Sequence, residues 1–256
     1  MLNLNSARMQ IRDFIKKTVE GAGRKSVVVG LSGGIDSAVS CTLAVEALGK
    51  SGVLALMMPD SRVTPEIDTN DAIELAKKLD IQYRVIDIAP IHSTYMTFLK
   101  PSKLPMGNLL ARIRMGILYY HANLDNRLVL GTEDKTEAFL GYFTRYGDSG
   151  TDLEPIEDLY KTDVRMMGRI LGVPDQIVRK ESSPALWRGQ TAEGEIHMSY
   201  DKVDNVIRVI NGQNAMIDVY EVAKKARVKV DTVRLVINMN KYTEFKRHNP
   251  PVCRLT

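Results

Sequence analysis

Cysteine is scarce in this chain: Cys41 and Cys253 are the only two in 256 residues. They are too few and too far apart for a disulfide framework or a CxxC metal site. Long apolar runs are also missing, and residues 1–17 mix charges into their apolar positions, unlike a signal peptide. These absences argue against a secreted scaffold and a membrane-spanning protein, and they predict a protein of the reducing cytoplasm.

Charge of one sign is not concentrated anywhere in the sequence. Lys and Arg total 35 and Asp and Glu total 31, so the net charge is +4, with no block long enough to form a nucleic-acid tail. Nucleic acid is therefore not an expected partner, whereas a phosphate-bearing ligand suits the mild positive balance. No repeat or shift in composition marks a boundary, so residues 1–256 are expected to form one domain.

Short β-branched runs alternate with segments of helical periodicity along the first half of the chain. This alternation predicts a doubly wound α/β fold, with a mostly parallel sheet, helices on both faces and a ligand at the carboxyl ends of the strands. Residues 181–198 lack a clean period and are expected to form a long mobile loop that covers the site. The expected strands are 26–31, 52–58, 81–88 and 127–131, and the expected helices are 5–21, 38–48, 67–79, 109–124, 164–171, 199–211, 215–227 and 230–245.

The strongest local signal is VVVGLSGGIDSAVS at 27–40, a strand followed by a glycine turn and a helix. Glycines let backbone N–H groups approach phosphate oxygens, and a helix N-terminus adds aligned donors. No Lys-Ser/Thr pair follows the glycines, so this is not a Walker A loop. The alternative is a plain glycine turn with Asp36 as the helix N-cap. As a phosphate loop, the segment supplies the candidate ATP contacts Gly30, Leu31, Ser32, Gly33, Gly34, Ile35, Asp36 and Ser37.

Two motifs carry a resemblance to known enzymes. The SGGIDS turn resembles the loop of the N-type ATP pyrophosphatases, which have an adenine nucleotide alpha-hydrolase-like fold. The segment GTEDKTEAFLGYFTRYGDSGTDLEPIEDLYK at 131–161, together with GNLLARIRM at 107–115, resembles the ammonia-dependent NAD synthetases. Their pattern runs GT–NK–E, then GYFTKYGD, then a downstream aspartate, proline and lysine.

The resemblance implies a two-step reaction that needs Mg²⁺ and uses ATP as co-substrate. The nicotinate carboxylate of deamido-NAD would be adenylated, and ammonia would then convert it to the amide, giving NAD, AMP and pyrophosphate. A homodimer is implied as well. Because the synthetase pattern occupies the whole chain, free ammonia or ammonia from another protein is the expected nitrogen source.

The same resemblance assigns roles to individual residues. Asp36 and Glu137 would be the magnesium ligands, since carboxylates suit this hard cation. Asp148 would be a buried aspartate that holds ammonium and accepts its proton. The expected catalytic residues are Asp36, Asp148 and Lys161; the further ATP contacts are Thr132, Lys161 and Ser183; and the deamido-NAD contacts are Arg112, Arg145, Asp152, Phe245 and Lys246.

Four of the departures from the family pattern lie in the predicted loop and among the predicted substrate contacts or their neighbours. Ala192 replaces an aspartate, His197 a glycine, Arg145 a lysine and Phe245 a histidine. Because the metal and phosphate residues are intact, these changes predict altered substrate affinity rather than an inactive protein. Two alternatives stay open: another pyrophosphatase-type enzyme, such as a GMP synthetase subunit or a tRNA-thiolating enzyme, and a regulatory nucleotide-binding protein without turnover.

Overall fold

The sheet of this protein has four parallel strands in the order β3-β2-β1-β4. A computed structural model describes residues 2–212 and 218–255. The strands are β1 (Val27–Gly30), β2 (Val53–Met57), β3 (Gln82–Val85) and β4 (Leu128–Leu130), each shorter than the apolar run that predicted it. The order reverses direction at β1, which has β2 on one side and β4 on the other. The predicted doubly wound α/β fold is confirmed.

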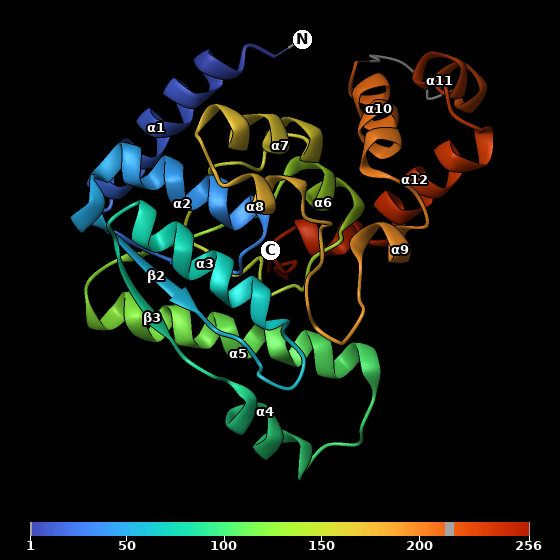
Figure 1. Ribbon diagram of the computed structural model, residues 1–256. Helices are drawn as coiled ribbons and strands as arrows, with labels where there is room; N and C mark the ends of the chain where they lie inside the picture. The colour runs from blue at the N-terminus through green and yellow to red at the C-terminus, as the bar shows by residue number, and fades with distance from the viewer. Residues whose placement is uncertain (1, 213–217, 256) are drawn as a thin grey trace.

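Alternate side chains of the strands enter two separate cores. Val27 and Val29 of β1 belong to one hydrophobic cluster, and Val28 between them belongs to the other. Figure 1 shows helices above and below the sheet. The first cluster includes residues of α1 (Leu4–Gly21), α2 (Ile35–Leu48), α3 (Glu66–Lys78), α7 (Lys161–Ile170) and α8 (Asp175–Arg179), and the second includes residues of α5 (Lys103–Leu124).

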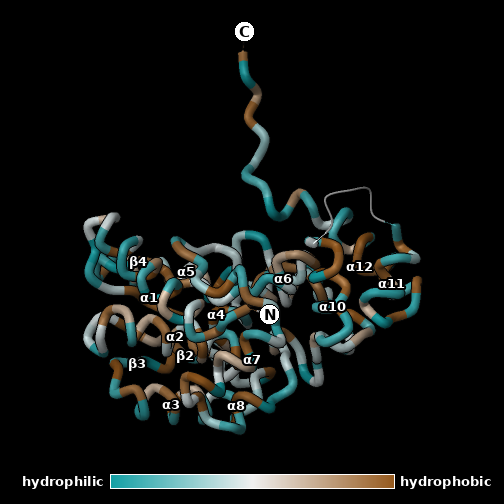
Figure 2. The backbone as a smooth tube through the Cα atoms, turned by 90° about the horizontal axis from the view of Figure 1, so that it is seen from above, coloured by the Kyte–Doolittle hydropathy of each residue, from teal (hydrophilic) through white to brown (hydrophobic). Residues whose placement is uncertain are grey.

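A third cluster joins the C-terminal helices, which lie to one side of the sheet in Figure 1. Its helices are α6 (Lys135–Leu140), α9 (Ala192–Ile196), α10 (Tyr200–Asn211), α11 (Val219–Ala226) and α12 (Val230–Tyr242). The start of the predicted helix 215–227 falls outside the described residues. Beyond the 3-10 turn Glu244–Arg247, the last residues extend away from the body (Figure 2). No helix in the described chain is long and apolar enough to cross a membrane.

Several short helices are absent from the sequence prediction. They are α4 (Ala89–Met96), α6, α8 and α9, each no longer than eight residues, too short for periodicity to reveal. The expectation that 181–198 lacks structure is wrong, because α9 lies within it and Thr191 caps that helix by accepting from Gly194 N–H. The helix predicted over 109–124 begins earlier, at Lys103.

Candidate functional site

The phosphate-loop candidate lies at the carboxyl end of β1, where the sheet order reverses. The hydroxyls of Ser32 and Ser37 lie 3.0 Å apart, and Ser37 Oγ accepts from the Ser32 N–H over 3.2 Å. Gly34 N–H donates to Ser32 Oγ over 3.3 Å. These bonds fold the turn tightly before α2 begins at Ile35. The N-cap position is held by Gly34, so the alternative that Asp36 is the N-cap is wrong.

Gly33 is required by the packing of this turn. Its φ is +79°, and a Cβ added there would lie 2.1 Å from the carbonyl oxygen of Asp68 in α3. A side chain at this position must therefore push the loop and α3 apart.

We expect Gly33→Ala to lower the free energy of unfolding by about 1–3 kcal/mol and to weaken ATP binding, because the turn and α3 must separate. Urea unfolding and ATP titration measure the two effects. Gly23→Ala is the matched control, since Gly23 has a similar φ of +67° but no atom within 4 Å of the added Cβ. Equal stability losses in the two variants would show that close packing at Gly33 is unimportant.

Three carboxylates converge on one ammonium group beside this loop. Lys161 Nζ lies 2.7 Å from Asp36 Oδ2, 2.7 Å from Asp134 Oδ2 and 2.8 Å from Glu137 Oε1. Carboxylate oxygens of the three acids all lie within 4.8 Å of one another. Lys161 and Asp134 have fully buried side chains, and those of Asp36 and Glu137 are 19% exposed. The chain thus brings together residues from α2, α6 and α7 that are up to 125 positions apart.

Local geometry explains how the cluster is held. Asp134 caps α6 by accepting from the N–H groups of Thr136 and Glu137 over 2.8 and 2.9 Å, which completes a capping box with Glu137. Thr136 Oγ1 accepts from Lys161 N–H over 3.1 Å and donates to Asp204 Oδ1 over 2.6 Å. The starts of α6 and α7 are therefore bound to each other and to α10.

Burial strongly perturbs the protonation of these groups. It raises the pKa of Asp134 to about 6, although the charge of Lys161 opposes the shift. Burial also raises the pKa of Glu137 well above its usual value, and the charge of Asp134 adds to that rise. Desolvation disfavours a charged Lys161, yet the three carboxylates outweigh it and raise the pKa of that ammonium. A second cation beside the carboxylates would favour their ionised forms.

The segment 181–198 is held by side-chain hydrogen bonds, most of them within the segment and one to the loop after β2. Ser183 Oγ donates to Gln190 O over 2.6 Å, so this predicted ATP contact is engaged within its own segment. Gln190 Nε2 donates to Glu195 Oε2 over 2.8 Å, and Arg188 Nε donates to Arg62 O over 2.9 Å. Thr132, another predicted ATP contact, is half-buried just beyond the end of β4.

Four of the five predicted deamido-NAD residues lie near one another. Arg112 donates to Arg145 O over 3.2 Å, and the guanidinium of Arg145 lies 6.0 Å from the ring of Phe245. Lys246 Nζ donates to the carbonyls of Gly141 and Phe143 over 2.8 and 2.6 Å. Phe245 is 59% exposed, so its ring is open to stacking with a flat ligand.

Two predicted site residues are left to place: Asp152, the fifth deamido-NAD contact, and Asp148, the predicted ammonium-binding residue. Asp152 is fully engaged at the sheet, where it accepts from Val129 N–H over 2.8 Å and from the Tyr119 hydroxyl over 3.1 Å. Asp148 accepts from Thr144 N–H over 2.9 Å. The expectation of a buried Asp148 is wrong for the residue as a whole, which is exposed. Desolvation by the surrounding protein nevertheless raises the pKa of its carboxyl.

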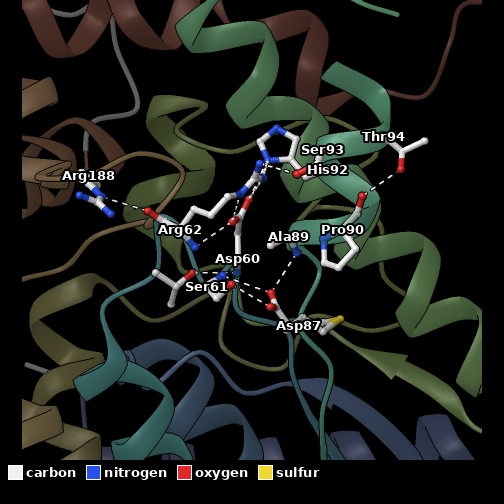
Figure 3. A network of polar contacts seen from close by, with 12 residues as sticks. Asp60, Ser61, Arg62, Asp87, Ala89, Pro90, His92, Ser93, Thr94 and Arg188 are labelled. Carbon is white, nitrogen blue, oxygen red and sulfur yellow. Dashed lines mark hydrogen bonds and ion pairs between the residues drawn. The ribbon is translucent and has the colours of Figure 1, made fainter. Parts of the chain in front are cut away.

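A second polar network, made of other residues, follows β2 (Figure 3). The fully buried carboxylate of Asp60 accepts from Arg62 over 2.7 and 2.9 Å and from His92 Nδ1 over 2.7 Å. Arg62 also donates to Ser93 Oγ over 2.6 Å. Burial alone would raise the pKa of Asp60, but the hydrogen bonds from Arg62 and His92 hold it at about 2. This network joins the loop after β2 to α4.

We expect Asp60→Asn to lower stability at pH 7 by about 2–3 kcal/mol. Because the folded-state pKa lies below the usual value, the stabilisation is present above about pH 4 and is lost as pH falls toward 2. Urea unfolding at several pH values measures the difference from the wild type, which should shrink on acidification. Asp80→Asn, in an exposed pair with Lys50, should change little at any pH. A pH-independent deficit at Asp60 would contradict this assignment.

Sequence reasoning missed three parts of this arrangement. Asp134 stands where the family pattern has asparagine, and only its spacing to Glu137 pointed to a helix cap. Tyr200 is fully buried, with its ring 5.1 Å from Lys161 Nζ. The Asp60 network had no signal in the sequence, because its members lie on separate elements.

Comparison with known proteins gives a consistent result over almost the whole chain. A family model described as NAD synthase matches residues 8–250. An NH(3)-dependent NAD(+) synthetase from Methanosarcina acetivorans is 46% identical over 258 residues, covering 99% of this chain and 100% of that protein. The enzyme of the same name from Hyperthermus butylicus is 44% identical, with coverage of 98% and 91%.

Solved structures also resemble the chain. An NMN synthetase from Francisella tularensis has a TM-score of 0.86 at 30% identity and is matched over 100% of both chains. An NH3-dependent NAD synthetase from Campylobacter jejuni has a TM-score of 0.83 at 28% identity, over 99% of this chain and 100% of the other. A glutamine-dependent NAD+ synthetase from Acinetobacter baumannii has a TM-score of 0.68 at 25% identity, but only 47% of that longer chain is covered.

Proposed function

The chain belongs to the NAD synthase family, and we propose that it uses ATP to amidate the nicotinate carboxylate of deamido-NAD with ammonia. In the first step a carboxylate oxygen attacks the α-phosphorus of ATP, and pyrophosphate leaves. In the second step ammonia attacks the activated carbonyl carbon, loses a proton and displaces AMP. The similarity of the full-length relatives, which are named for ammonia dependence, supports ammonia as the nitrogen source.

The observation that carries this proposal is the convergence of Asp36 and Glu137 beside the SGGIDS turn. Both carboxylates contact the same cation, Lys161 Nζ. Asp36 Oδ1 is buried and has no hydrogen-bond partner among the described residues, which leaves it available as a metal ligand. The donor set of carboxylate oxygens fits Mg²⁺. When bound, Mg²⁺ would supply electrostatic stabilisation of the charge on the leaving pyrophosphate.

The chain's own groups have distinct tasks in this proposal. The SGGIDS turn and the start of α2 direct backbone donors toward phosphate oxygens, with Thr132 and Ser183 as further ATP contacts. The ammonium of Lys161 stabilises phosphate charge in the adenylation step. No side chain acts as the nucleophile, because the substrate carboxylate takes that role.

The substrate side of the site is basic and aromatic. Arg112, Arg145 and Lys246 provide positive charge for the pyrophosphate of deamido-NAD, and Phe245 offers a ring for stacking. Asp148, close to Lys246, holds ammonium and accepts its proton. Asp152, held against β4 by the Val129 N–H, is a further proposed contact to deamido-NAD.

We propose a homodimer built on the apolar surface around α4 and α5. β3 is one of the two edge strands of the described sheet, and its Tyr83 and Val85 are exposed. Phe98, between the two helices, is 81% exposed, and Leu104, in the first turn of α5, is 61% exposed. Such a surface on an edge strand favours association. A cytoplasmic setting is supported by the two cysteines, both of which are free.

One assay tests the function directly. Purified protein is mixed with ATP, Mg²⁺, ammonium and deamido-NAD, and AMP and NAD are quantified together. Equal amounts of the two products are expected. AMP formed only with another acceptor would favour a different pyrophosphatase-type reaction, and the absence of both products would favour a regulatory protein.

The acceptor needs a separate comparison, because one similar structure is an NMN synthetase. The assay is repeated with the deamido form of nicotinamide mononucleotide at equal concentration. We expect a higher kcat/KM for the dinucleotide. A preference for the mononucleotide would replace deamido-NAD in the proposal and leave the amidation chemistry unchanged.

A further inference from the structure

The charge of the acid cluster exceeds what its lysine can neutralise. Asp36, Asp134 and Glu137 carry three formal negative charges, and Lys161 carries one positive charge, so the formal sum is −2. Like charges buried together destabilise a fold unless they are paired. A single divalent cation would bring the formal charge of the cluster to zero.

The third acid, Asp134, carries a formal negative charge that its role as a helix cap does not require. Its Oδ1 caps α6, and the side chain of asparagine caps a helix equally well. The family pattern has asparagine at this position. What the aspartate adds is a second anionic oxygen, Oδ2, which lies fully buried and faces Lys161 at 2.7 Å.

A neighbouring side chain independently indicates a ligand here. Tyr200 is fully buried, and its hydroxyl has no hydrogen-bond partner in the part of the chain that the structure describes. Buried tyrosine hydroxyls usually find a partner. The Tyr200 ring lies 5.1 Å from the Lys161 ammonium, which contacts all three acids. A hydrated cation among the carboxylates would offer this hydroxyl a water molecule.

The spacing of the acids also suits an ion. Ligand atoms from Asp36, Asp134 and Glu137 all lie within 4.8 Å of one another. Oxygen ligands on opposite sides of Mg²⁺ are about 4.2 Å apart, twice the bond length of about 2.1 Å. The three oxygens can therefore share one ion after small side-chain shifts.

We propose that Asp134 completes a three-carboxylate site with Asp36 and Glu137 that binds a divalent cation before any nucleotide is present. The inference rests on the proposed function only in placing this ion beside ATP. The ion takes over the neutralisation of the carboxylates from Lys161, which frees its ammonium for a phosphate. A site with asparagine at 134 depends more on ATP to hold its metal, because one ligand and one charge are missing.

The test is a titration of MgCl₂ into nucleotide-free, full-length protein by calorimetry, with thermal unfolding as a second readout. The wild type should bind one ion saturably and unfold at a higher temperature with Mg²⁺. Asp134→Asn keeps the helix cap and should weaken binding at least tenfold and abolish the thermal shift. Asp158→Asn, at an exposed acid, is the control and should match the wild type.

Tyr200→Phe provides a second variant, because it removes only the hydroxyl. It should keep or raise thermal stability, since no protein hydrogen bond is lost, and weaken Mg²⁺ binding a few-fold. Absence of saturable binding to the nucleotide-free wild type, or equal affinity in wild type and Asp134→Asn, would overturn the inference.

Failure of this inference is distinguishable from failure of the proposed function. A wild type that forms NAD but binds no ion without ATP overturns the inference alone. A wild type that binds Mg²⁺ through Asp134 yet forms no NAD supports the inference and overturns the function.

Discussion

Replacing Lys161 with methionine should lower the free energy of unfolding by about 3–5 kcal/mol and abolish measurable NAD formation. The substitution keeps an unbranched side chain, one atom shorter than lysine, but leaves three carboxylates without their cation. Removing one partner of a buried ion pair leaves the other charges uncompensated. Urea unfolding at pH 7 measures the loss of stability, and the coupled AMP and NAD assay measures the loss of activity.

The pH and Mg²⁺ dependence of the stability of Lys161→Met shows whether unpaired carboxylates cause its loss of stability. At pH 5 the deficit should shrink, because protonated carboxyls need no counter-charge and burial already raises the pKa of Asp134 to about 6. Added Mg²⁺ should also recover part of the stability by replacing the ammonium. Lys135→Met is the control, since its exposed partner Asp158 makes that pair worth at most about 1 kcal/mol. A Lys161→Met protein as stable as the control would contradict the role assigned to the cluster.

The frame of this fold could be predicted from single segments of sequence. SVVVGL and GVLALMM are apolar because both faces of their strands are covered, and this makes them visible without tertiary information. The SGGIDS turn is equally local, because its glycines and the following helix are contiguous. Short helices such as α6 are different: six residues cannot show a period, and the prediction omitted this helix although Asp134 and Glu137 have the spacing of a capping box.

The candidate site could be predicted only in part, because it depends on contacts between elements. The resemblance named Asp36, Glu137 and Lys161, and the structure brings them together. The resemblance did not indicate that three carboxylates would surround Lys161, or that Asp134 would be one of them. Sequence motifs and their spacing do not show which side chains of distant elements are in contact. Ser183 illustrates the same limit, because its bond to Gln190 depends on how the segment 181–198 folds back on itself.

We expect Asp148→Asn to reduce NAD formation by about 10²–10⁴-fold at pH 7 and to raise the KM for ammonium. Ammonia is present largely as ammonium at that pH, and ammonium must lose a proton before its nitrogen can attack. The raised pKa of Asp148, caused mainly by desolvation, makes its carboxylate a better proton acceptor than an ordinary aspartate. Asparagine retains an oxygen that can accept from Thr144 N–H, so the loop should keep its shape.

Separate measurement of the two steps shows whether Asp148 serves ammonia rather than folding. Exchange of labelled pyrophosphate into ATP, measured with deamido-NAD and without ammonium, reports adenylation alone. The Asp148→Asn protein should retain this exchange within a few-fold of the wild type, because Asp148 has no part in the first step. Raising the pH should partly restore NAD formation, since more of the nitrogen is then present as free ammonia. Loss of pyrophosphate exchange together with amidation, or an unchanged KM for ammonium, would remove Asp148 from the second step.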